Sequence, residues 1–124
     1  MVQNSFQLEK QKNYTLKIRQ IVKDLPPFCA SYFRAMENTT SILTRYGYAI
    51  DLRSFFQFLT GPAGPFPDRS VSSLTISDLN SLRAVNIEEF IEEMSLYVRD
   101  EREITNQERA KARKLATLRS FFKY

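Results

Sequence analysis

The longest helical pattern of the chain lies in the stretch Thr44-Arg45-Tyr46-Gly47-Tyr48-Ala49-Ile50-Asp51-Leu52-Arg53-Ser54-Phe55-Phe56-Gln57-Phe58-Leu59. With about 100° of rotation per residue, its largest apolar side chains gather in one arc about 100° wide. This arc predicts the buried face of a helix that runs from about Ser41 to Leu59. Its members are Tyr48, Leu52, Phe55, Phe56 and Leu59.

The opposite arc of this helix is unusual for a face that meets only water. It combines aromatic and aliphatic side chains with a base, and it includes Gly47, which in mid-helix costs about 1 kcal/mol against alanine. We therefore expect this face to contact something other than solvent. Its residues are Leu43, Tyr46, Gly47, Ile50, Arg53 and Gln57.

The rest of the chain also has helical periodicity, which predicts an all-α fold. The clearest break is the segment from Thr60 to about Leu74, which contains three prolines. We expect a small bundle of four core helices with one extra helix at the N-terminus. The predicted helical segments are about Asn13–Asp24, Phe28–Glu37, Ser41–Leu59, Thr75–Leu82, Asn86–Asp100 and Thr105 to the end of the chain.

The composition limits the chemistry that this chain can perform. Its 124 residues fit one compact domain and include no histidine, one cysteine (Cys29) and three glycines. This excludes catalytic machinery built on histidine and glycine-rich phosphate-binding loops. No Cys or His cluster could hold zinc, and no apolar run reaches the roughly 18 residues that span a bilayer. We expect a protein that is not an enzyme by itself and that needs no cofactor, metal or membrane.

The net charge of +4 hides a strong partition along the chain. Residues 1–85 contain ten bases and six acids, residues 86–104 two bases and seven acids, and residues 105–124 six bases and one acid. An acidic helix is therefore expected next to a basic one. A mild excess of bases is compatible with a nucleic-acid partner without requiring one.

The last predicted helix has two contrasting faces. On the helical wheel, Leu115, Leu118 and Phe122 form the expected buried stripe, with Lys111 at its upstream end. Arginines one turn apart, followed by short hydroxyls, suit a helix that lies in the major groove of DNA. A solvated amphipathic helix would show the same charges. The outward arc carries Asn106, Arg109, Arg113, Thr117 and Ser120, with Lys123 at its edge.

Two segments, taken in order, resemble the N-terminal core-binding domain of tyrosine recombinases, the SAM-like domain of phage integrases. The first is the stretch quoted above, and the second is Ala112-Arg113-Lys114-Leu115-Ala116-Thr117-Leu118-Arg119-Ser120-Phe121-Phe122-Lys123-Tyr124. The resemblance extends over residues 27–124. The extra N-terminal helix before Pro26-Pro27-Phe28 looks like that of XerS-like single recombinases. Integrases of mobile elements are nearly as similar.

The resemblance implies a domain organisation and a function. Residues 1–26 would form an N-terminal extension with one helix. Residues 27–124 would form a DNA-binding domain, half of a clamp around a recombination half-site in double-stranded DNA. Strand cleavage through a phosphotyrosyl intermediate would belong to a separate catalytic domain. The implied setting is the bacterial cytoplasm at the nucleoid, with other protomers of the same recombinase in a synaptic tetramer, and with the isolated chain as a monomer.

The resemblance also assigns DNA contacts by position, on the helix around Gly47 and on the last helix. Thr44 and Gly47 belong to this predicted interface. The expected phosphate contacts come from Arg53, Arg109, Lys114 and Lys123. The expected base contacts come from Arg113, Thr117, Tyr46 and Ile50. The chain departs from the family pattern at Ala110 and Lys111, near the start of the last helix.

The alternative from a different functional class is a helical protein-interaction domain that does not bind DNA. Its partner surfaces would be the acidic segment 86–104 and the face that carries Tyr46 and Ile50. Charge reversal at Arg109 and Arg113 would separate the two hypotheses. It should abolish DNA binding and leave protein association largely intact.

Overall fold

The structure, a computed structural model, describes residues 5–101 and 104–123, with side chains at 6–94, 109 and 111–123. This described part is helical and contains no strand, which confirms the predicted all-α class. The elements are α1 (Ser5–Lys23), α2 (Cys29–Met36), α3 (Ile42–Thr60), a short 3-10 turn η1 (Val71–Ser73), α4 (Ile76–Asn80), α5 (Ala84–Glu101) and α6 (Ile104–Lys123).

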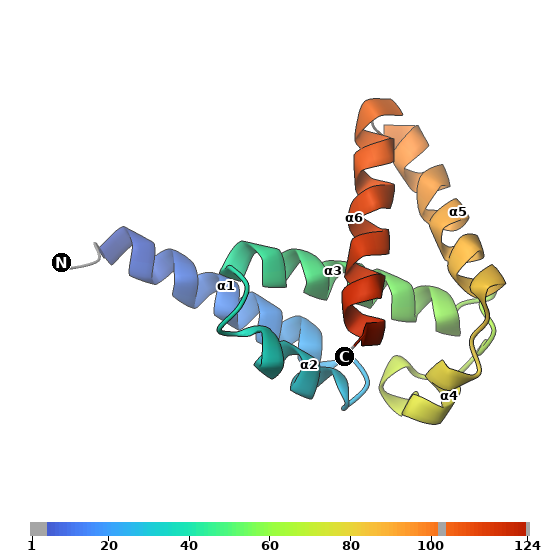
Figure 1. Ribbon diagram of the computed structural model, residues 1–124, viewed down its shortest axis with the longest axis horizontal. Coiled ribbons are helices and arrows are strands. Elements are labelled where there is room, and N and C mark those ends of the chain that lie inside the picture. The colour runs from blue at the N-terminus through green and yellow to red at the C-terminus, as the bar shows by residue number, and fades with distance from the viewer. Residues whose placement is uncertain (1–4, 102–103, 124) are drawn as a thin grey trace.

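The other helices are arranged around α3 (Figure 1). α1 packs along α3, and its N-terminal half extends past the rest of the molecule. α6 crosses α3 and pairs with α5, so that these two helices form a hairpin that rises from α3. The proline-rich segment and α4 lie near the C-terminal end of α3.

Local hydrogen bonds account for where two of the helices begin. α3 follows Ser41, whose hydroxyl oxygen accepts the backbone N–H of Thr44 at 3.2 Å, as expected of an N-cap. α5 begins at Ala84, ahead of the predicted Asn86. The side-chain oxygen of Asn86 accepts the backbone N–H of Arg83 at 2.8 Å, so Asn86 caps the helix from inside its first turn.

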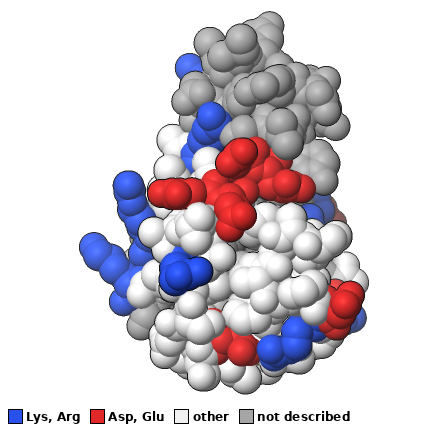
Figure 2. Space-filling view, turned by 90° about the vertical axis from the view of Figure 1, so that its right-hand side faces the viewer, with Lys and Arg blue, Asp and Glu red and all other residues white. Residues whose placement is uncertain are grey.

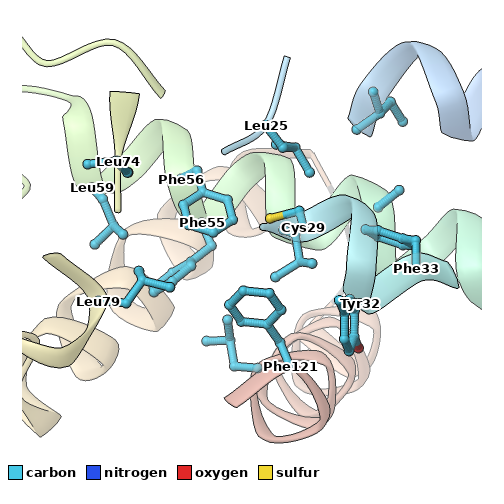
Figure 3. Packing of buried hydrophobic residues seen from close by; sticks show 14 of the residues in the cluster. Leu25, Cys29, Tyr32, Phe33, Phe55, Phe56, Leu59, Leu74, Leu79 and Phe121 are labelled. Atoms are coloured by element: carbon cyan, nitrogen blue, oxygen red, sulfur yellow. The ribbon is translucent and has the colours of Figure 1, made fainter. Parts of the chain in front are cut away.

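The predicted buried face of α3 is confirmed for Leu52, Phe55, Phe56 and Leu59, which are fully buried, whereas Tyr48 is half-buried. Figure 3 shows side chains from α2, α3 and α6 meeting in one aromatic core. The rings of Phe56 and Phe121 lie 6.0 Å apart between centroids, and those of Tyr32 and Phe121 lie 5.1 Å apart. Edge-to-face pairs of this kind add stability beyond the area that they bury.

α1 contributes to the same core and is not a separate appendage. Ile18 and Ile21 of α1, with Leu25 just after its end, are buried in the cluster that α3 forms with α2 and α6. α1 also begins at Ser5 and is longer than the predicted helix from Asn13. Because its C-terminal half is buried against α3, the extension over residues 1–26 cannot be removed without opening the core.

The predicted buried stripe of α6 is wrong in its orientation. Phe122, expected inside, is 46% exposed, and Leu115 is only half-buried. Leu118 is buried, as expected. The observed inward face is turned by about one residue from the predicted one and consists of Lys114, Thr117, Leu118 and Phe121.

We predict that Gly64→Ala destabilises the fold. A Cβ atom at Gly64 would overlap the backbone carbonyl oxygens of Phe58 and Leu59. The backbone there is held in place, because the N–H of Phe66 donates to the carbonyl of Leu59 at 2.9 Å. Overpacking of this kind typically lowers the free energy of unfolding by about 1–3 kcal/mol.

Urea unfolding followed by circular dichroism measures this loss. Gly47→Ala is the matched control, since a Cβ atom at Gly47 meets no atom within 4 Å. Equal stability of the Gly64→Ala variant and the parent would show that the turn rearranges freely.

Candidate nucleic-acid interface

A buried carboxylate, Asp51, lies where α6 crosses α3. Its side chain is 1% exposed, and three side chains of α6 bind it. Arg113 donates from Nε and Nη2 at 3.1 and 2.7 Å, Lys114 from Nζ at 3.1 Å and Thr117 from Oγ1 at 2.8 Å. We call these four residues the Asp51 cluster. Bidentate and charge-assisted bonds are among the strongest hydrogen bonds in proteins.

The Asp51 cluster carries one more positive than negative charge. Among the described residues, Asp51 is the only carboxylate that forms an ion pair with Arg113 or Lys114. The Arg113 side chain is 54% exposed and binds Asp51 through Nε and Nη2, so that no described side chain occupies Nη1. Arg113 is therefore a cation held in a fixed orientation at the surface, and it provides the surplus positive charge, since Lys114 and Asp51 balance each other.

The outward orientation predicted for Thr117 is wrong, and Lys114, for which the resemblance implied a phosphate contact, is buried. Thr117 is 0% exposed, and the ammonium group of Lys114 is buried against Asp51. A helical wheel places Thr117 outside because its neighbours are polar, but the partner that draws it inward stands on α3. Neither side chain is available for direct contact with DNA. Both instead hold α6 in its orientation on α3.

The other predicted contact residues divide into exposed and half-buried groups. Arg53, Arg109, Lys123 and Thr44 are exposed. Tyr46, Gly47 and Ile50 are half-buried. The predicted Asn106 lies outside the described side chains. Ser120, predicted to face outward, is half-buried and shares a hydrogen bond of 2.9 Å with the hydroxyl of Tyr32.

The face of α3 that was expected to contact something is partly covered by α1. The ring of Tyr14 meets that of Tyr46 edge-on, with 5.1 Å between centroids. Around α3, Tyr46 on the α1 side and Asp51 on the α6 side lie about 140° apart. In the N-terminal half of α3, the residues between them are Leu43, Gly47 and Ile50, which we call the open strip.

The open strip is accessible to a partner. Leu43 is 49% exposed, and Gly47 faces open space, because no atom would lie within 4 Å of a Cβ there. Cations stand on both sides of the strip, with Arg113 on α6 and Arg53 on the side of α1. Packing within this chain therefore does not require a glycine at position 47, because a larger side chain would have room there.

A different face of the molecule is acidic. Figure 2 shows carboxylates gathered in one patch over α5. Glu88, Glu89 and Glu92 are exposed there, and Glu93 is half-buried beside a hollow at the C-terminal end of α3. The acidic and basic segments of the sequence thus place their charges on different faces of the molecule. A polyanion would be repelled by the α5 face.

Two groups with nucleophilic chemistry lie in the core. Burial raises the pKa of the Cys29 thiol to about 12, and the side chain is fully enclosed. Burial also raises the pKa of the Tyr32 hydroxyl, although its hydrogen bond with Ser120 opposes this effect. Both groups are therefore protonated at neutral pH and sit away from the open strip.

Comparisons with protein-family models, curated proteins and solved structures found no match for this chain. Within the described residues, no helix combines the length and apolar character required to cross a membrane. The same residues contain no group of three or more His, Cys, Asp or Glu side chains that could hold a metal ion.

We predict that Asp51→Asn strongly destabilises the protein. The variant leaves the buried Lys114 ammonium and the Arg113 guanidinium without a counter-charge. Breaking a buried ion pair on one side typically lowers the free energy of unfolding by about 3–5 kcal/mol. Urea unfolding measures this loss.

The matched control is the double variant Asp51→Asn, Lys114→Met, which also removes the buried cation. It should recover a large part of the lost stability, because methionine keeps much of the apolar stem. A loss below about 1 kcal/mol in Asp51→Asn would show that water screens the cluster and that it does not hold α6.

Proposed function

We propose that this chain is the DNA-binding N-terminal domain of a tyrosine recombinase or integrase, and that it grips a half-site of the recombination site. The observation that carries the proposal is the open strip on α3, with Gly47 at its centre and cations on both sides. The resemblance of the two sequence segments to core-binding domains supports it independently of this geometry.

Phosphate contacts would come from the exposed cations beside the strip. Arg53 and Arg109 are exposed, and Arg113 presents the guanidinium edge that Asp51 does not occupy. Because Asp51 already fixes the Arg113 side chain, less rotamer entropy is lost when it binds a phosphate. Such contacts set affinity and register, and they weaken steeply as salt increases.

Close approach of the duplex would explain Gly47. A glycine in mid-helix lowers helix stability by about 1 kcal/mol relative to alanine, and no neighbouring side chain needs the space. A sugar-phosphate backbone or a base edge lying on the strip would need it. Ile50 would then meet thymine methyl groups, which are the apolar feature of the major groove.

Within this proposal, cleavage belongs to a catalytic domain elsewhere in the parent protein, and this chain contributes binding alone. It needs no cofactor. Its further partners would be other protomers of the recombinase in a synaptic tetramer, and its setting would be the bacterial nucleoid. Residues 27–124 would form the binding domain, with α1 from the N-terminal extension packed against it.

The protein-interaction hypothesis has one observation in its favour. A shallow hollow between α2 and α6 is lined by the exposed Phe122, by Tyr32 and Met36, and by the cations Arg119 and Lys123. It lies apart from the open strip, so variants of the strip would leave it intact. The following experiment therefore distinguishes the two functions.

We predict salt-sensitive binding of duplex DNA. Fluorescence anisotropy with a labelled pool of duplexes about 30 base pairs long, from about 50 to 200 mM salt, measures it. The variant Arg53→Gln, Arg109→Gln should bind about tenfold or more weakly, with the log–log salt slope reduced by about 2. Charge reversal at Arg113 is avoided, because it would place two carboxylates side by side in the Asp51 cluster.

The matched control is Arg34→Gln, Arg83→Gln, which removes the same charge from exposed positions on α2 and before α5. Its affinity for DNA should stay within about twofold of the parent's, because removing two distant charges weakens only the screened long-range attraction. Absence of binding at 50 mM salt, or equal losses in both double variants, would contradict the proposal.

We predict opposite effects of Gly47→Ala on stability and on DNA binding. The free energy of unfolding should rise by up to about 1 kcal/mol, because the new methyl group meets open space. DNA affinity should fall by about fivefold or more, because the methyl group occupies the approach path. Anisotropy measures the DNA affinity and urea unfolding measures the stability of the same preparation. A more stable variant with unchanged affinity would show that the strip is not part of the DNA interface.

A further inference from the structure

A cleft between α1 and α3 gathers positive charge on the side of the open strip away from α6. It is lined by Lys17, Gln20, Lys23, Asp24, Tyr46 and Arg53, with Ile21 at its base. The first four of these come from α1 and its end, and the resemblance to core-binding domains assigns a DNA contact to none of them. The charge of this cleft therefore comes mainly from the N-terminal extension.

The three cations of the cleft are not neutralised within the fold. Lys17, Lys23 and Arg53 are exposed, and none of them forms an ion pair with a described carboxylate. Asp24 is the single acidic side chain among the described residues of the lining. Three cations against one carboxylate leave a local surplus of positive charge facing solvent.

Lys17 is held in position by aromatic rings. Its ammonium nitrogen lies 5.1 Å from the centroid of the Tyr14 ring and 5.8 Å from that of Tyr46. Cation–π contact at these distances orients the group without consuming its hydrogen bonds. Gln20 adds amide donors from the same helix, one turn further along α1.

We propose that this cleft binds a backbone phosphate of the duplex, so that α1 forms a second wall of the DNA interface opposite α6. The proposal rests on the proposed function of the open strip and extends it to a helix to which the resemblance assigns no DNA contact. α1 leaves Gly47 uncovered, so it flanks the approach path instead of closing it. A duplex on the strip would meet cations of α6 on one side and of α1 on the other.

The test is the double variant Lys17→Gln, Lys23→Gln in the full chain, measured by anisotropy with the same duplex pool. Both side chains are exposed, so the fold should remain intact, and circular dichroism checks this. We expect affinity to fall by about tenfold and the salt slope to decrease by about 1, because the contact to one phosphate is lost. The control is again Arg34→Gln, Arg83→Gln.

The outcomes separate this proposal from the proposed function. Loss of binding in Arg53→Gln, Arg109→Gln with full binding in Lys17→Gln, Lys23→Gln would overturn the α1 site alone. Tighter binding by the lysine variant would also overturn it, because α1 would then shield the interface. Absence of binding by the parent chain would overturn both.

A gain of affinity provides a second and independent test. Asp24→Asn removes the only carboxylate among the described residues that line the cleft. If a phosphate enters there, affinity should increase by about two- to fivefold at low salt, and the gain should shrink as salt screens the charge. Unchanged affinity would place the phosphate away from α1.

Discussion

The interaction on which this structure depends most is the one between Asp51 and its three partners on α6. A carboxylate in the middle of α3 would be strongly unfavourable if it were buried alone. Arg113, Lys114 and Thr117 bind it together, and this sets the rotation of α6 about its own axis. That rotation buries Phe121 in the aromatic core and leaves Phe122 exposed. It also aims one edge of the Arg113 guanidinium at solvent beside the open strip.

The molecule has one face with a surplus of positive charge and another with a surplus of negative charge. The cations of α6 and of the cleft beside α1 stand on either side of the open strip, while the carboxylates of α5 gather elsewhere (Figure 2). A polyanion is attracted to the first face and repelled by the second, which orients it before any specific contact forms. The surplus charge of the Asp51 cluster strengthens the basic face through Arg113, although the other three members lie too deep to touch a ligand.

Much of the fold could be predicted from periodicity, and the reasons for the failures are physical. The apolar arc of α3 identified its buried face because large apolar side chains such as Leu52 and Phe55 are buried whichever helices cover them. The same reasoning misplaced Thr117, since a wheel weighs hydropathy and cannot include a carboxylate more than 60 residues away in the chain. Asp51 offered a signal that was not used: an acid at the edge of an apolar arc needs a cationic partner. The position of α1 over Tyr46 was not predictable for a similar reason, because it depends on packing between distant segments.

The most direct test of this account is to map the DNA-facing surface by nuclear magnetic resonance. Backbone amide signals of the ¹⁵N-labelled chain would be followed during titration with a short duplex at low salt. If the duplex lies on the open strip, the largest changes should fall on α3 around Gly47, on α6 around Arg109 and Arg113, and on α1 around Lys17, with little change at Glu88–Glu92 of α5. Changes confined to the hollow around Phe122, or to α5, would contradict it.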